Sequence, residues 1–176
     1  MNVKARLMES EDIRRALVRL SHQIIEKNHG AEGLCLIGIR TRGVPLAERI
    51  ASNIRQYEGV SVPVGALDVT HFRDDIDRTA AGQTDTSSIG FDITAKSIVL
   101  VDDVLYTCRT ARAAMDAVMK LGRPARIQLA ALIDRGHSEL PIKANYIGKS
   151  IPTSHAETVC VRLAETDGVS EVVLLG

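Results

Sequence analysis

The sequence predicts an α/β fold, with a mostly parallel sheet that is flanked by helices on both faces. Apolar runs of strand length alternate along the chain with segments whose apolar residues recur at helical spacing. Several of these runs are continuously apolar, which is typical of strands covered on both faces. The 176 residues suit one compact domain, 1–176, and no internal repeat divides them.

The first half of the chain is expected to supply two helices and two strands. Residues 10–28 have helical periodicity, and Ser10 is expected to cap that helix. The apolar run GLCLIGI, residues 33–39, predicts a buried strand. A second helix is expected from about Pro45, because proline suits a first helical turn, and residues 61–69 predict the next strand.

The second half of the chain begins with a change in amino-acid composition. Residues 73–90 are rich in Thr, Ser, Asp and Gly and lack periodicity, so they predict a long functional or flexible loop. A buried strand at 98–101, a helix at 110–121 and a strand at 126–134 follow. Shorter strands are expected in the segments NYIGKSI, TVCVRLA and SEVVLL. In parallel sheets of this kind, ligands bind beyond the carboxyl ends of the strands.

Composition narrows the class of protein. No apolar run approaches the roughly 20 residues that a bilayer span needs, and the N-terminal segment lacks a secretory apolar core. We therefore expect a cytoplasmic protein that does not bind membranes. The three cysteines are scattered, which argues against a disulfide framework or a zinc site. The 22 basic and 22 acidic residues balance, so any nucleic-acid binding must come from a local patch.

Two adjacent carboxylates mark the candidate site. Asp102 and Asp103 follow the buried strand and precede the loop VLYTCRT, which leads into a helix. A helix start offers unpaired N–H groups to a phosphate, and Tyr106, Thr107 and Thr110 add hydroxyls. The carboxylates suit sugar hydroxyls or magnesium-bound water. The pattern therefore predicts a ribose 5-phosphate site, and the alternative is a solvated strand end followed by a capped helix.

Residues 98–110 closely resemble the signature of type I phosphoribosyltransferases for 5-phosphoribosyl-1-pyrophosphate (PRPP). Three further stretches, GIRTRGVPLAERI, DVTHFRDD and DRGHSELPIKANYIGKSIPTS, resemble one subfamily, which combines attenuation of pyrimidine operons with uracil phosphoribosyltransferase activity. The resemblance covers about residues 4–174. It implies the type I phosphoribosyltransferase fold, with a flexible loop at about 73–90 and a small hood over the base at about 134–160.

The resemblance implies a role for each part of the PRPP site. Asp102 and Asp103 contact the ribose hydroxyls, the following loop holds the 5-phosphate, and Arg42 and Arg73 contact the pyrophosphate. These four residues form the implied catalytic set. The implied PRPP- and nucleotide-binding residues are Thr41, Arg42, Asp102, Asp103, Val104, Leu105, Tyr106, Thr107, Cys108, Arg109 and Thr110. Mg²⁺ is the implied cofactor, held mainly through PRPP oxygens rather than by direct protein ligands.

The implied reaction is displacement of pyrophosphate from PRPP by a uracil nitrogen, which gives UMP. Arg135, Ile147 and Val159 are the implied uracil contacts. The PRPP signature does not identify the base, so a phosphoribosyltransferase for another base is the alternative. The stretch from residue 134 to 154 favours the pyrimidine member.

The subfamily also binds a stem-loop of pyrimidine operon mRNA under the control of UMP and UTP. Three basic residues of the first helix share one face at i, i+4 and i+7 spacing. The candidate RNA-binding residues are Arg15, Arg19, His22, Lys27, His137, Lys143 and Lys149. They would form a concave patch, completed across a homodimer or a larger homo-oligomer. The alternative is an ordinary solvated helix face, and Ser138 replaces an arginine that the subfamily commonly has.

Cys108 departs from the subfamily, which usually has glycine there. Glycine allows positive φ and a close approach of phosphate. The thiol is therefore either tolerated at negative φ, or crowds the phosphate, or serves as an oxidisable group at a helix start. Crowding would leave a regulator with weak or lost catalysis.

Overall fold

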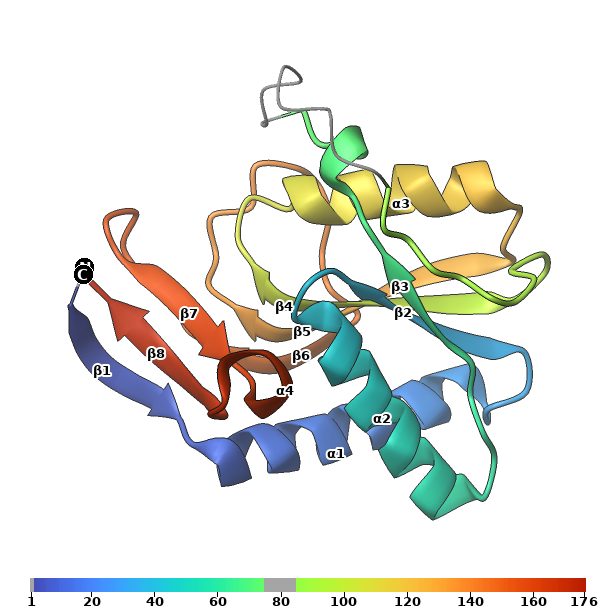
Figure 1. Cartoon of the computed structure of the whole chain (residues 1–176), viewed down its shortest axis with the longest axis horizontal. Helices are drawn as coiled ribbons and strands as arrows, with labels where there is room; N and C mark the ends of the chain where they lie inside the picture. The colour runs from blue at the N-terminus through green and yellow to red at the C-terminus, as the bar shows by residue number, and fades with distance from the viewer. Residues whose placement is uncertain (1, 75–84) are drawn as a thin grey trace.

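The computed structural model describes residues 2–74 and 85–176. In these residues five parallel strands form a sheet in the order β3-β2-β4-β5-β6, so the predicted α/β class is confirmed (Figure 1). The strands are β2 (Leu34–Ile39), β3 (Val64–Leu67), β4 (Ser97–Leu105), β5 (Arg126–Asp134) and β6 (Tyr146–Ser150). All of β2 is buried, as its continuous apolar run predicts.

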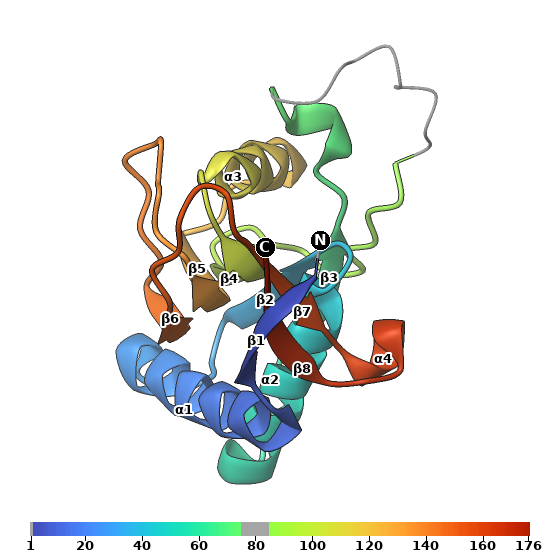
Figure 2. The same cartoon turned by 90° about the vertical axis from the view of Figure 1, so that its left-hand side faces the viewer.

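Helices cover both faces of this central sheet (Figure 2). α1 (Ser10–Asn28) and α2 (Gly43–Glu58) lie on one face and α3 (Arg109–Leu121) on the other. Two core layers result, one against each face of the sheet. Within the described residues, no helix has both the length and the apolar character needed to cross a membrane.

A second, antiparallel sheet is built from the two ends of the chain. Its order is β1-β8-β7, and we call it the hood sheet. The strands are β1 (Val3–Met8), β7 (Thr158–Arg162) and β8 (Glu171–Leu175), and the short α4 (Ala164–Asp167) connects β7 to β8. Asn2 and Gly176 exchange backbone hydrogen bonds of 3.2 and 3.1 Å, so the termini lie side by side. The hood expected at 134–160 shares only the start of β7 with this sheet.

Several local details differ from the sequence expectations. Glu9, not Ser10, is the N-cap of α1, and its backbone N–H donates to the Asp12 carboxylate at 2.9 Å. α2 begins two residues before Pro45, and β4 continues through both aspartates to Leu105. Of the loop expected at 73–90, residues 75–84 lie outside the described residues, and a 3₁₀ turn, η1 (Thr70–Phe72), leads into it.

Two glycines allow α2 to start close to the central sheet. A Cβ on Gly38 would overlap the backbone of Gly43 and Val44, and a Cβ on Gly43 would overlap the carbonyl oxygen of Val101. Both glycines therefore bring the loop before α2 against β4, directly beside Asp102. The Arg40–Thr41 peptide in this loop is cis.

Candidate active site

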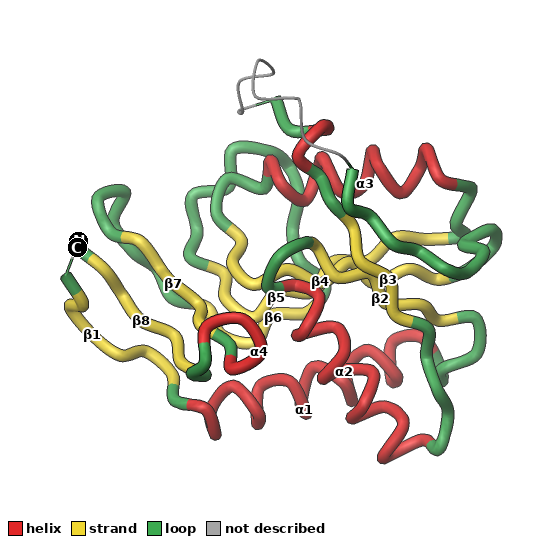
Figure 3. Tube along the Cα trace, in the orientation of Figure 1, coloured by secondary structure: helices red, strands yellow, loops and turns green. Residues whose placement is uncertain are grey.

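The carboxyl ends of the parallel strands face the hood sheet, and the loops that follow them meet there (Figures 1 and 3). The loop after β2 carries Thr41 and Arg42, and the loop after β4 carries Tyr106, Thr107 and Cys108. This is the edge at which an α/β sheet binds its ligands.

Asp102 and Asp103 are held at this edge by their own backbone. The Asp103 N–H donates to Asp102 Oδ1 at 2.9 Å, and the Val104 N–H donates to Asp103 Oδ1 at 2.9 Å. Asp102 is only 6% exposed. Burial, and then the neighbouring charge of Asp103, raise the pKa of Asp102 well above its usual range, against the opposing influence of Arg73. Arg73, expected to be part of this site, therefore lies within electrostatic range of Asp102.

The loop after β4 leads directly into α3. The side chain of Cys108, the N-cap residue of α3, makes no capping hydrogen bond, so we call this helix start uncapped. The N–H groups that follow that of Arg109 in the first turn are available to an anion. The Thr107 hydroxyl accepts a long hydrogen bond from the Arg109 N–H at 3.5 Å. The Arg109 side chain turns outward and pairs with Glu139 at 3.0 Å and Asp74 at 2.9 Å. An uncapped helix start next to two carboxylates is the arrangement that the ribose 5-phosphate hypothesis requires.

Cys108 is the N-cap of α3 and has a left-handed backbone, with φ of 67°. The option of tolerance through a negative φ is therefore wrong. The thiol is 5% exposed and is turned toward the loop after β5. Its Sγ lies 3.6 Å from the carbonyl oxygen of Ile142 and accepts from the Ser138 hydroxyl at 3.3 Å. The two residues that depart from the subfamily, Cys108 and Ser138, are therefore in contact with each other.

Arg42, the residue before α2, contacts α4. Its Nη2 and Nε donate to the two carboxylate oxygens of Asp167, at 2.8 and 3.1 Å. This pair raises the pKa of Arg42, and the charge of Asp103 raises it further. The guanidinium therefore contacts α4 and lies within electrostatic range of Asp103.

Aromatic rings and a buried guanidinium line the side of the site toward β5. Arg135 is 5% exposed, lies 4.0 Å over the Tyr106 ring and donates to the carbonyl oxygens of Ser154 and Glu157. The His137 and His155 rings lie 3.9 Å apart, and His155 Nδ1 is 3.2 Å from the Tyr106 hydroxyl.

Neither His155 nor Asp167 is among the residues that the sequence predicts for this site. Neither residue has a local signal, because each meets its partner through a contact more than forty positions away in the chain.

The other two expected uracil contacts lie elsewhere. Ile147, in β6, borders a hollow of about 560 Å³ together with Gln23 and Lys27 of α1. Val159, in β7, is 7% exposed and packs in the core with Val161 and Leu163. Of the three expected uracil contacts, Arg135 is the one that the structure brings beside Tyr106.

The expected RNA-binding residues fall on two parts of the molecule. Five lie on α1 and on the adjacent β6, namely Arg15, Arg19, His22, Lys27 and Lys149. The Arg19 guanidinium donates to the Gly148 carbonyl oxygen, which ties α1 to β6. His137 lies beside His155, and Lys143 borders a small hollow on the α3 side of the sheet.

No group of three or more His, Cys, Asp or Glu residues in the described chain is arranged to hold a metal ion. The donors at the site are the carboxylates of Asp102 and Asp103, each with one oxygen that accepts a backbone N–H. Carboxylate oxygens suit the hydrated Mg²⁺ ion, which keeps several of its waters. The residues present therefore fit a Mg²⁺ ion bound through water and substrate oxygens.

The chain matches the model of the phosphoribosyl transferase domain over residues 5–165. It is 57% identical over 176 residues to the bifunctional protein PyrR of Chloroflexus aurantiacus, covering 99% of this chain and 97% of that protein. It is 56% identical over 177 residues to the bifunctional protein PyrR of Thermus thermophilus, with the same coverage.

Solved structures share the fold at much lower identity. A hypoxanthine phosphoribosyltransferase from Trypanosoma cruzi superposes with a TM-score of 0.78 at 18% identity, covering 99% of this chain and 96% of that one. A hypoxanthine-guanine phosphoribosyltransferase from Bacillus anthracis gives 0.74 at 17% identity, covering 99% and 100%. These likenesses bear on the fold alone. The length and identity of the sequence matches, together with the strand-end aspartates and the uncapped helix beside them, place the chain in the phosphoribosyltransferase family, among the bifunctional PyrR proteins.

Proposed function

We propose that this protein transfers the phosphoribosyl group of PRPP to uracil, and that it also binds pyrimidine operon mRNA in response to uridine nucleotides. The observation that carries the first activity is the pair Asp102–Asp103 beside the uncapped N-terminus of α3. It offers acceptors for a ribose diol and donors for a 5-phosphate within one strand-loop-helix segment.

Binding in this site would orient the ribose before the reaction. The α3 N-terminus and the hydroxyls of Thr107 and Thr110 hold the 5-phosphate, and the two carboxylates accept hydrogen bonds from the ribose hydroxyls. Thr41, Arg42 and Arg73 hold the pyrophosphate. A ribose held at both ends presents its anomeric carbon to the base in a fixed orientation, and such positioning supplies much of the rate enhancement in a displacement.

The reaction breaks the bond between the anomeric carbon and the pyrophosphate oxygen and forms one to a uracil nitrogen, whose proton passes to the solvent. Positive charge develops on the ribose ring, where Asp102 and Asp103 offset it, and negative charge develops on the leaving pyrophosphate beside Arg42 and Arg73. Mg²⁺, held by PRPP oxygens and through water by the two aspartates, would neutralise part of the charge on the leaving group.

The base would lie on the side of Tyr106. Arg135, His137 and His155 surround the Tyr106 ring there and offer both an aromatic face and polar edges. Ile147 in β6 and Val159 in β7 remain proposed uracil contacts, and of the three proposed contacts Arg135 is the one beside Tyr106.

Phosphoribosyl transfer from PRPP and Mg²⁺ to a panel of uracil, orotate, adenine, guanine and hypoxanthine tests this proposal. We expect UMP from uracil and no product from the purines. Turnover of a purine in place of uracil would refute the base assignment. No turnover with any base would leave the regulatory function, and Cys108 and Ser138 would be the residues to revert.

RNA binding is supported by the cationic residues of α1 and β6. Arg15 is largely exposed and lies on the same helix face as Arg19 and His22. We propose that this face, with Lys27 and Lys149 beside it, contacts the phosphates of the mRNA stem-loop. The homodimer or larger homo-oligomer that would join two such faces, and a cytoplasmic location where nascent mRNA is met, belong to the same proposal.

A pair of neighbouring arginines tests the RNA surface. Arg14 and Arg15 both pair with Glu11 on α1, but only Arg15 belongs to the proposed surface. Arg15→Gln should weaken binding to the operon stem-loop and reduce the slope of log affinity against log salt by about one. Arg14→Gln is the matched control and should change neither. Equal effects of the two variants would contradict the proposed surface.

A further inference from the structure

We propose that Asp167 in α4 is a positioning residue, which holds the Arg42 guanidinium in the orientation that receives the pyrophosphate of PRPP. This inference rests on the role proposed above for Arg42. It adds α4, which connects two strands of the hood sheet, to the pyrophosphate site, through a residue far from the PRPP signature in the sequence.

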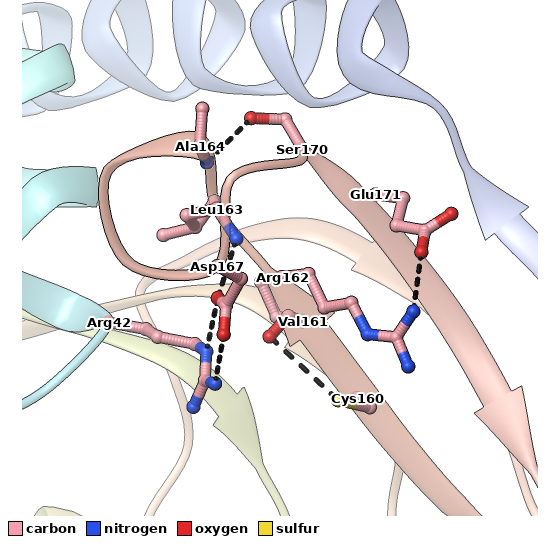
Figure 4. Close-up of polar contacts among 9 residues, drawn as sticks. All are labelled: Arg42, Cys160, Val161, Arg162, Leu163, Ala164, Asp167, Ser170 and Glu171. Carbon is pink, nitrogen blue, oxygen red and sulfur yellow. Dashed lines mark hydrogen bonds and ion pairs between the residues drawn. The ribbon is translucent and has the colours of Figure 1, made fainter.

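The contact between the two residues has the geometry of a planar fork. Arg42 Nη2 donates to Asp167 Oδ1 at 2.8 Å, and Arg42 Nε donates to Oδ2 at 3.1 Å (Figure 4). Two parallel hydrogen bonds fix both the position and the plane of a guanidinium, whereas one hydrogen bond leaves it free to rotate. The side chains are 33% and 21% exposed, so water screens the pair only in part.

Asp167 is itself held by the turn that contains it. Its Oδ2 accepts from the Leu163 N–H at 2.9 Å, and its own N–H donates to the Leu163 carbonyl oxygen at 2.6 Å. The Ser170 hydroxyl accepts from the Ala164 N–H at 3.2 Å and closes the other end of the turn (Figure 4). Arg42 and then the Leu163 N–H lower the pKa of Asp167, which keeps the carboxylate ionised at neutral pH.

Arg42 is therefore held at both ends. Its backbone lies directly before Gly43, which packs closely against the Val101 carbonyl, and its guanidinium is held by Asp167 of α4. A guanidinium has five N–H groups, and the fork to Asp167 uses one on Nε and one on Nη2. The Nη1 amino group is not used by this pair, and the charge of Asp103 lies within electrostatic range of the same guanidinium.

An arginine fixed in advance loses little conformational freedom when the ligand arrives, so more of its interaction energy goes into binding. The opposite effect is also physically reasonable, because a carboxylate that competes with pyrophosphate for Arg42 would weaken PRPP binding. The two possibilities differ in sign. The fork leaves donors free and lies on the guanidinium edge that faces α4, so the geometry favours positioning over competition.

Asp167→Asn is the decisive variant, because the amide oxygen can still accept from the Leu163 N–H while the charged fork is lost. We expect the dissociation constant of Mg²⁺-pyrophosphate and the KM for PRPP to rise about fivefold to tenfold. The dissociation constant of UMP should not change, because UMP has no pyrophosphate. A general structural loss in the hood would weaken both ligands equally, which would overturn the proposal.

Glu165→Gln is the matched control. Glu165 is also in α4 and also forms a fork to an arginine of α2, with Arg49 at 2.6 and 2.8 Å. It does not touch Arg42, so its variant should leave both dissociation constants unchanged. If Asp167→Asn does not fold, Asp167→Glu keeps the charge and should show a smaller rise in the pyrophosphate constant than Arg42→Gln.

Arg42→Gln separates this inference from the function on which it rests. Weaker pyrophosphate binding in Arg42→Gln, with no further loss in the double variant, supports both. If Arg42→Gln weakens pyrophosphate but Asp167→Asn leaves it unchanged or tightens it, the positioning role is wrong and the assignment of Arg42 stands. If Arg42→Gln has no effect, the pyrophosphate contact of Arg42 and the positioning role of Asp167 are both wrong.

Discussion

Two acidic side chains of almost equal burial, Asp102 at the edge of the central sheet and Glu171 in the hood sheet, have opposite surroundings. Asp102 is 6% exposed and Glu171 is 7% exposed. The residue next to Asp102 is another carboxylate, Asp103, and the hydrogen bond that Asp102 accepts comes from the backbone. Glu171 is clamped between Arg6 at 3.0 Å and Arg162 at 2.8 Å, with both guanidinium groups on its carboxylate.

The surroundings of Glu171 are those of a structural ion pair, whereas the surroundings of Asp102 are those of a ligand-binding site. A buried carboxylate beside a second carboxylate is unfavourable to folding, and such groups concentrate at functional sites. A carboxylate between two guanidiniums offsets its own desolvation and joins β1, β7 and β8. The charges of the hood sheet therefore hold its strands together, whereas the central sheet has two adjacent carboxylates, which Arg73 offsets only in part, at the edge where the substrate would bind.

Neutralising Asp102 should produce the largest effect on activity and leave folding intact. Asp102→Asn removes a charge from the ribose site, so we expect kcat/KM for PRPP to fall about 100-fold. The same change should stabilise the protein by about 1 kcal/mol at neutral pH, because the buried charge is gone. Steady-state kinetics and chemical unfolding measure the two effects. A less stable variant would contradict the comparison with Glu171.

The pH dependence of that stability has a definite sign. Burial raises the pKa of Asp102 above the value of about 3.8 expected for the unfolded chain. The folded state therefore binds the proton more tightly, and stability falls as the pH rises from 3.8 through the raised pKa. Asp102→Asn should lack this decrease, and a difference in unfolding free energy that stays constant across that range would show that Asp102 does not titrate as described.

Neutralising Glu171 should give the opposite result. Glu171→Gln leaves Arg6 and Arg162 without their common partner, and we expect a loss of about 1 kcal/mol because both arginines remain partly exposed to water. Phosphoribosyl transfer should stay within about twofold of the parent. Amide hydrogen exchange should locate the loss in β1, β7 and β8, and an equal loss of protection in β4 would show that the hood and the central sheet unfold together.

How much of the molecule could be predicted depends on how far apart in the chain the contacting residues lie. The segment of residues 98–110 is local, since a strand, two acids, a loop and a helix start follow one another, and the structure has them in that order. β1 was not expected, because its exposed charged residues show no apolar run, and it forms only by pairing with β8 at the other end of the chain. The Arg42–Asp167 and Tyr106–His155 contacts likewise join distant segments, so local spacing contains no trace of them.

Cys108→Gly should produce the smallest effect on stability and activity, and it tests whether the thiol contributes to the PRPP site. Glycine would relieve the left-handed backbone at φ 67° but lose the buried contacts of Sγ with Ser138 and Ile142. Each contribution is about 1 kcal/mol and the two oppose each other, so the free energy of unfolding should change by less than about 1 kcal/mol. Because Sγ is turned toward the loop after β5 rather than left exposed at the site, the KM for PRPP should stay within about twofold. A severalfold lower KM in the glycine variant would show that the side chain crowds the 5-phosphate. Cys108 would then weaken PRPP binding at the same edge at which Asp102 lowers the stability of the folded protein.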